Sequence, residues 1–180
     1  MSRMGPEPIE KYRKLSKQLI DPSLLLELRK LFEREYTLTE LLEWLHRKVK
    51  WSKGKITRHN DPRRILAYGK GRCGEFSILF TALCLAHNYR ARLILDMSDH
   101  VWTEVWNKKQ NRWVHVDPSE KRIDDPKMYE RDWKKSLKEI YAFENGNLED
   151  VTKRYKIASN PSNRQTMTVK KKNQSSQNHE

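Results

Sequence analysis

The sequence contains little cysteine and no long apolar run. Cys73 and Cys84 are the only two cysteines among 180 residues, which is too few for a disulfide framework or a four-cysteine zinc site. No stretch is long and apolar enough to cross a membrane, and the first residues lack the apolar core of a secretory signal. These absences favour a soluble protein of a reducing, cytoplasmic compartment.

Basic residues outnumber acidic residues in this sequence. The chain holds 37 lysines and arginines against 24 aspartates and glutamates, a net charge of +13. A basic surface can attract nucleic acid, anionic membranes or acidic substrates. No aromatic-interleaved RNA-binding signature and no helix-turn-helix pattern accompanies the charge. We therefore interpret the charge as a source of solubility and expect neither nucleic acid nor a membrane as partner.

The N-terminal third carries helix signals, and we expect residues 1–64 to form the helical part of a single domain. Apolar residues recur near helical spacing from Ile9 to Leu19. Asp21 before Pro22 is typical of a helix start, and Thr37 with Glu40 predicts a capping box. We expect a polar loop over residues 52–62. Residues 157–180 are basic and polar, and we expect a disordered tail there.

The middle of the chain predicts one buried helix followed by strands. We expect a helix over residues 72–87, and its interior, residues 76–86, is apolar nearly all round, as in a central helix. Residues 90–96 read as a strand, and 100–106 with 112–117 as a hairpin. Residues 140–144 and the region 150–155 are further strand candidates. The pattern predicts an α+β fold in which the helix packs on an antiparallel sheet.

A thiol, an imidazole and a carboxylate stand in short motifs along this region. Cys73 lies in GRCGEF, His100 in DHVWTEV and Asp117 in WVHVDPSE. These residue types can form a thiolate nucleophile, its base and the group that orients the base. Cys73 falls in the first turn of its predicted helix, where free N–H groups and the macrodipole favour the thiolate. Cys84 lies farther along the same helix and suits an inert core position.

Strand alternation predicts that His100 and Asp117 share a face of the hairpin. Side chains alternate along a strand, so His100, Trp102 and Glu104 share one face, and Val101, Thr103 and Val105 share the other. If the valine faces of both strands coincide, His100 and Asp117 are within reach. We expect the Cys73 helix to pack against that face.

Other residues compete for these roles. Asp96 and Asp99 are alternative orienting carboxylates, and His115 is an alternative base on the same face. We interpret the remaining histidines, His46, His59 and His87, as surface or packing residues. Trp102, Trp106 and Trp113 suit a core, although a tryptophan on a catalytic face can also stack on a sugar ring.

The motifs resemble the core of cytosolic peptide:N-glycanases, which belong to the transglutaminase-like superfamily of papain-like folds. The resemblance covers about residues 65–156, and it rests on GRCGEF, DHVWTEV, RWVHVDPSE and the downstream series from DDPKMYERDW to DVTKRY. It implies a transglutaminase-like catalytic core over this range. The family's nucleophile, base and orienting residue correspond to Cys73, His100 and Asp117.

The same resemblance implies substrate-binding residues. Glu104 corresponds to the family's glutamate implicated in contacting the chitobiose core of a glycan. Trp44 and Trp51 resemble two tryptophans that line the family's cleft, and Trp102 lies on the catalytic face. The chain departs from the family elsewhere: the paired zinc-binding cysteines are missing before Cys73. It is similar to a minimal form, for which we expect no metal and no cofactor.

The resemblance implies an amidase that cleaves the glycosylamide bond of N-glycosylated asparagine through a Cys73 thioester and leaves aspartate. Its expected partners are N-glycosylated, unfolded proteins or glycopeptides. A transamidase or a cysteine peptidase would use the same thioester chemistry. A non-catalytic DNA- or protein-binding module of the same fold is a further alternative, which the presence of all of Cys73, His100 and Asp117 disfavours.

Overall fold

The computed structural model describes residues 7–158. Its helices are α1 (Glu7–Gln18), α2 (Pro22–Arg29), α3 (Leu38–Lys48), α4 (Pro62–Tyr68), α5 (Cys73–Ala86), α6 (Met128–Arg131) and α7 (Thr152–Tyr155). No helix in this range is long and apolar enough to cross a membrane. Residues 159–180 of the expected tail lie outside the described residues.

The strands form two sheets. The strands are β1 (Lys50–Trp51), β2 (Lys70–Gly71), β3 (Ala91–Asp96), β4 (His100–Asn107), β5 (Arg112–Asp117), β6 (Arg122–Ile123), β7 (Ile140–Glu144) and β8 (Asn147–Asp150). β1 and β2 form a short parallel pair, and the others form an antiparallel sheet of order β6-β5-β4-β3-β7-β8. The α+β fold with a cysteine-bearing helix on an antiparallel sheet is confirmed.

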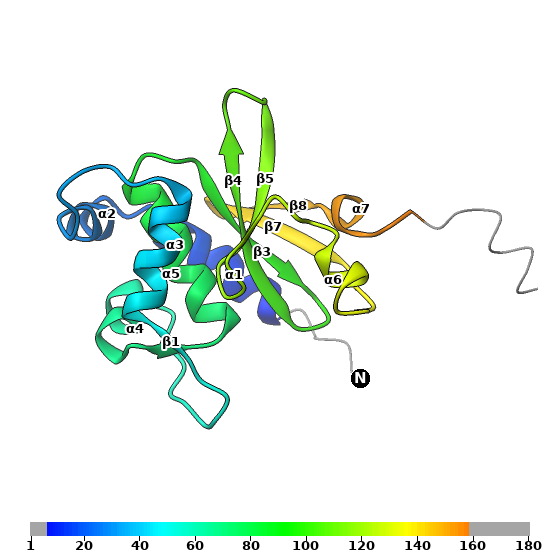
Figure 1. Ribbon diagram of the computed structural model, residues 1–180, viewed down its shortest axis with the longest axis horizontal. Helices are drawn as coiled ribbons and strands as arrows, with labels where there is room; N and C mark the ends of the chain where they lie inside the picture. The colour runs from blue at the N-terminus through cyan, green and yellow to red at the C-terminus, as the bar shows by residue number, and fades with distance from the viewer. Residues whose placement is uncertain (1–6, 159–180) are drawn as a thin grey trace, which may run out of the picture.

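The N-terminal helices begin where their capping residues predict. The Asp21 side chain accepts a hydrogen bond from the N–H of Leu24, and Thr37 and Glu40 form the reciprocal bonds of a capping box. Figure 1 shows α1, α3 and α5 gathered on one side of the main sheet, while α6 and α7 lie toward its other end. Apolar side chains from α1, α2, α3 and α5 join one core cluster with the sheet.

The faces of the sheet follow the predicted alternation. Val105 pairs with Val114 and Glu104 with His115, so the two valine faces coincide. A separate apolar cluster around Trp102 fills the opposite face, beneath α6 and α7. The sheet therefore separates two cores, and each face has its own set of covering elements.

Helix α5 packs on the valine face, and the prediction that it packs on the His100 face is wrong. Val101, Val105 and Val116 belong to the same cluster as the apolar residues of α5. The Ser77 hydroxyl also donates to the carbonyl of Val101, 2.9 Å away. The opposite face is already filled by the cluster around Trp102 and by residues of α6 and α7, so the apolar residues of α5 pack on the valine face.

Two further segments differ from the sequence-based prediction. The expected loop over residues 52–62 is followed by a helix that the sequence did not predict, α4. Asp61 caps its start, and Gly69 ends it in the left-handed conformation, at φ 70°. The region 150–155 is not a strand beyond its first residue: β8 ends at Asp150, and Thr152–Tyr155 is the short helix α7. Asp150 accepts from the N–H of Thr152, which favours a turn there.

Candidate active site

Cys73 is the first residue of α5 and is partly exposed. The chain enters the helix through the β2 strand, where Gly71 pairs with Trp51. A side chain at Gly71 would place its Cβ only 2.6 Å from the Cβ of Glu75, so glycine is required at this close approach. Arg72 holds the preceding loop by donating to the carbonyl of Gly54, 2.8 Å away. The nucleophile candidate therefore stands at a rigid helix start.

Glu75 fixes the first turn of α5. Its Oε2 accepts from the backbone N–H of Arg72 at 2.9 Å, and its Oε1 accepts from Nε of Arg58 at 2.6 Å. Burial would raise the pKa of Glu75, but Arg58 and the Arg72 N–H hold it below its usual value. The resulting carboxylate ties the loop that carries Arg58 to the start of the helix.

His100 and Asp117 are joined directly. His100 Nε2 lies 2.7 Å from Asp117 Oδ2, and both side chains are buried. Because Nε2 is used by Asp117, the other ring nitrogen is left for Cys73. His100 is the first residue of β4, and this end of the strand lies near the start of α5. The Cys73 side chain interacts with the His100 ring. His100 and Asp117 share a sheet face, whereas Cys73 reaches His100 because the start of α5 and the start of β4 converge.

The environment of His100 favours its charged form. Burial lowers the pKa of His100, but the interactions with Asp117 and with Cys73 outweigh burial and raise the pKa to about 9. The imidazole is therefore held as an imidazolium at neutral pH. A cation beside a cysteine is the setting in which a thiolate is stabilised.

Asp117 is held by a dense set of donors. Oδ1 accepts from the N–H and hydroxyl of Ser119 and from the N–H of Glu120, at 2.8–3.2 Å. Oδ2 accepts from the Tyr129 hydroxyl at 2.9 Å as well as from His100. Burial would raise the pKa of Asp117, but these donors hold it below its usual value. The carboxylate therefore stays ionised although it is buried.

Tyr129 extends this network to His115. The hydroxyl hydrogen of Tyr129 points to Asp117, so the 2.7 Å contact with His115 Nε2 makes the histidine the donor. His115 Nδ1 accepts from the N–H of Asp125 at 3.2 Å. Burial lowers the pKa of His115 to about 4. His115 is therefore a neutral support of Tyr129.

The alternative carboxylates are engaged elsewhere. Asp96 accepts from the N–H and hydroxyl of Ser98 and from the N–H of Lys138. Asp99 occupies the turn before β4 with φ 119°, as expected of a turn residue. Of these carboxylates, Asp117 is the one that hydrogen-bonds His100.

Aromatic rings surround His100. The exposed ring of Trp133 lies 5.1 Å from it in an edge arrangement, and Tyr129 lies 5.4 Å from it. Sequence reasoning gave neither residue a site role. The sequence could have pointed to them, because Tyr129 and Trp133 both belong to the DP-x2-Y-x3-W motif downstream of Asp117. Trp102, by contrast, is fully buried and stacks on Tyr129 with ring centroids 4.5 Å apart.

Glu104 lies in a buried ionic cluster. Its Oε2 accepts from Nε of Arg92 at 2.7 Å, and its Oε1 accepts from Tyr155 at 2.7 Å and from Arg154. Glu104 and Arg92 are 0% and 3% exposed, so the carboxylate is covered by protein groups. Arg154 is about one third exposed at its side chain, and it separates Glu104 from solvent.

The two upstream tryptophans lie in different surroundings. Trp51 is 49% exposed and pairs through its strand with Gly71, two residues before Cys73. Trp44 is buried in α3 and packs against Phe32 with ring centroids 4.7 Å apart. The structure therefore brings Trp51 to the exposed surface beside the start of α5 and places Trp44 in the core.

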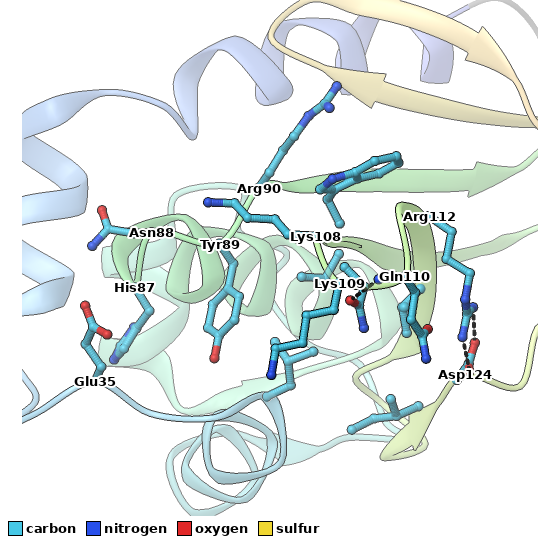
Figure 2. A pocket seen from close by; sticks show the side chains of 16 residues that line it. Glu35, His87, Asn88, Tyr89, Arg90, Lys108, Lys109, Gln110, Arg112 and Asp124 are labelled. Carbon is cyan, nitrogen blue, oxygen red and sulfur yellow. Dashed lines mark hydrogen bonds and ion pairs between the residues drawn. The ribbon is translucent and has the colours of Figure 1, made fainter.

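A separate pocket of about 600 Å³ lies at the other end of α5. Figure 2 shows its lining from the segment after α5 and from the β4–β5 hairpin, including His87, Tyr89, Lys108 and Lys109. It contains none of Cys73, His100 and Asp117. Within residues 7–158, no cluster of three histidine, cysteine or acidic residues could hold a metal ion.

Comparisons with known proteins identify the family and the fold of the chain. Residues 28–118 match the transglutaminase-like superfamily, and residues 97–178 match the Rad4 transglutaminase-like domain. A Rad4 structure, from a Rad4-Rad23 complex bound to a 6-4 photoproduct lesion, superposes with a TM-score of 0.63 at 17% identity. That superposition covers 83% of this chain and 46% of Rad4.

Curated relatives share more sequence over a shorter span. Peptide-N(4)-(N-acetyl-beta-glucosaminyl)asparagine amidase of Drosophila melanogaster is 48% identical over 101 residues, which cover 56% of this chain and 16% of the relative. The amidase of Arabidopsis thaliana is 44% identical and is covered to 14%. The amidase of Oryza sativa is 46% identical and is covered to 22%. The chain thus matches a small part of these relatives.

The superfamily match spans half of the chain, and it includes Cys73, His100 and Asp117. The fold agrees with it over most of the described residues. On this evidence, the chain belongs to the transglutaminase-like superfamily and resembles the core of the peptide:N-glycanases.

Proposed function

We propose that this protein is a cysteine-dependent amidase that removes N-linked glycans from unfolded glycoproteins or glycopeptides. The observation that carries the proposal is the 2.7 Å hydrogen bond between His100 and Asp117 beside the helix-start Cys73. The 44–48% identity to relatives named as glycan amidases supports the choice of substrate.

The proposed reaction has two steps. The Cys73 thiolate attacks the side-chain carbonyl carbon of the glycosylated asparagine. The C–N bond breaks as His100 gives its proton to the departing glycosylamine, and a thioester remains. Water then loses a proton to His100 as it adds to the thioester carbon. The C–S bond breaks, which leaves aspartate in the peptide and restores the thiolate–imidazolium pair. Asp117 holds the His100 ring in place and stabilises its charge.

Two exposed tryptophans near Cys73 and His100 support a sugar-binding role. Trp133 presents an exposed ring next to His100, and Trp51 presents one beside the helix start. Aromatic faces of this kind can stack on sugar rings and exclude water. Glu104 acts on substrate in this proposal only through Arg154, because its own oxygens are covered by Arg92, Arg154 and Tyr155.

The test uses a denatured glycoprotein with high-mannose glycans. The purified protein is expected to release intact glycan and to convert the attachment asparagine to aspartate, which mass spectrometry detects. The Cys73→Ala variant should lose this activity, while Cys84→Ser serves as the matched control on the same helix. Failure of well-folded protein to release glycan across a broad pH range would contradict the proposal.

The rival reactions are separable in the same preparation. Incorporation of a primary amine into protein without glycan release would favour a transamidase. Cleavage of a peptide chain would favour a peptidase. Covalent labelling of Cys73 by a haloacetamidyl sugar, but not by simple peptide electrophiles, would support the glycanase.

A further inference from the structure

The hydroxyl of Tyr12 lies close to the start of α5. Tyr12 lies in α1, is 7% exposed, and packs its ring 6.1 Å from Phe143. The buried tyrosines Tyr129 and Tyr155 donate their hydroxyls to Asp117 and Glu104. The Tyr12 oxygen lies beside the first turn of α5, close to Gly74. A tyrosine hydroxyl in this place can donate to a group bound at the start of the helix.

The absence of a side chain at Gly74 leaves a narrow space that is lined by Tyr12 and Arg58. A carbon added at the Cβ position of Gly74 would lie 3.6 Å from the Tyr12 hydroxyl and 3.3 Å from Nη2 of Arg58. Gly74 directly follows Cys73, so this space adjoins the start of α5. Glycine keeps the space free, and its walls are hydrogen-bond donors.

Arg58 and Tyr12, which line this space, are each held in place by other residues. Arg58 is fixed through Nε by the buried Glu75, 2.6 Å away. The Tyr12 ring is fixed by its burial in the core cluster. Cys73 has no preceding helical turn to accept its own backbone N–H, because it is the first helical residue. Three donors therefore lie at the start of α5: this N–H, the Tyr12 hydroxyl and the Arg58 guanidinium.

The local charges keep Tyr12 protonated. Burial and the negative charge of Cys73 raise the pKa of Tyr12, while Arg58 opposes them. A tyrosine with a raised pKa donates a hydrogen bond throughout the neutral and mildly alkaline range.

We propose that the Tyr12 hydroxyl and the backbone N–H of Cys73 bind the oxyanion that forms when the Cys73 thiolate adds to a carbonyl. The inference rests on the thioester chemistry proposed above. As the S–C bond forms, the π electrons of the carbonyl move to its oxygen, and both donors stabilise that charge without giving up their protons. The Tyr12 ring is held by its packing in the core, so little reorganisation is needed.

The test compares two reactions of Cys73 in Tyr12→Phe. Acylation by p-nitrophenyl acetate passes through an oxyanion, whereas alkylation by iodoacetamide does not. Phenylalanine keeps the ring that packs on Phe143. The rate of the p-nitrophenolate burst should fall about 10²-fold, in the range found for loss of one oxyanion donor. The alkylation rate and its pH profile should stay as in the wild type. Tyr89→Phe, which removes a hydroxyl at the far end of α5, should change neither rate.

The outcomes are distinct. An unchanged acylation rate in Tyr12→Phe would overturn the inference. Equal losses in acylation and alkylation would also overturn it, because they would show that Tyr12 acts on the thiolate. A wild-type protein that is acylated at Cys73 but releases no glycan would refute the glycanase and leave the oxyanion role standing on the ester result. A wild-type Cys73 that is never acylated would overturn both.

Discussion

The Tyr129 hydroxyl donates to Asp117 Oδ2, the same oxygen that binds His100 Nε2. Tyr129 in turn accepts from His115, whose other nitrogen accepts from the Asp125 N–H. One assignment of donors and acceptors therefore satisfies every hydrogen bond in this network. The network therefore fixes the orientation of the His100–Asp117 pair from the side of the sheet opposite to α5.

Replacing Tyr129 by phenylalanine should destabilise the protein by about 1–3 kcal/mol, because Asp117 loses a donor and His115 Nε2 loses its acceptor in a buried site. Denaturant unfolding measures this change. Glycan release should also slow, with a shifted pH profile, because the Asp117–His100 pair changes. Tyr68→Phe, at an exposed tyrosine, is the control. A Tyr129→Phe protein with wild-type stability and an unshifted profile would refute the role of the network.

Asp117→Asn should reduce activity on the order of 10⁴-fold, as expected when the base is held in the wrong tautomer. The shape of the side chain is kept, but its charge is lost. The pKa of His100 should fall from about 9, because the interaction with Asp117 that raises it is removed. Titration of the imidazole by NMR checks this direction. A His100 pKa that stays near its wild-type value would contradict the assignment of Asp117.

His115 should make stability depend on acid pH. Its folded-state pKa, about 4, is lower than its ordinary value of 6.5, so protonation favours the unfolded chain. The stabilisation is fully present above about pH 6.5 and is lost as the pH falls through 4. By pH 4 the loss amounts to about 3 kcal/mol.

His115→Gln provides the comparison, because glutamine can donate to Tyr129 and accept from the Asp125 N–H without titrating. Denaturant unfolding from pH 7 to pH 4 should show the wild type losing stability relative to this variant. Parallel pH curves for the two proteins would show that His115 is not the neutral, buried group described above.

Glu104→Gln should destabilise the protein by about 3 kcal/mol, because the buried Arg92 loses the charge of its partner. Glu149→Gln is the matched control: Glu149 contacts the same arginine but its side chain is 58% exposed, and its loss should cost less than about 1 kcal/mol. Unfolding of both variants measures the difference. Lost glycan release at unchanged stability in Glu104→Gln would instead assign Glu104 directly to the substrate.

Native alkylation should distinguish the two cysteines. Cys84 is fully buried, and burial raises the pKa of its thiol well above the ordinary value, so iodoacetamide should modify Cys73 alone. Mass spectrometry should find one adduct in folded protein and two after unfolding. Cys73→Ser should give none while folded. Rapid modification of Cys84 in the native state would contradict the packing of α5.

The sequence by itself determined the local features. The caps at Asp21 and Thr37 follow from side chains that bond the nearest free N–H groups. The shared side of His100 and Asp117 follows from strand alternation, since the register pairs the valines. The short helices α4 and α7 were not predicted, because a few residues carry too little periodicity to separate a helical turn from a loop.

Tertiary structure decided how these local features combine. The sequence alone predicted that α5 packs on the face of His100, but in the structure α5 packs on the valine face. Cys73 approaches His100 because the start of α5 and the start of β4 converge at one edge of the sheet. The burial of Glu104 by Arg92 and Arg154, and the approach of Tyr12 to Gly74, join segments far apart in the chain. Such contacts depend on how whole elements pack, and no pattern within a single segment encodes them.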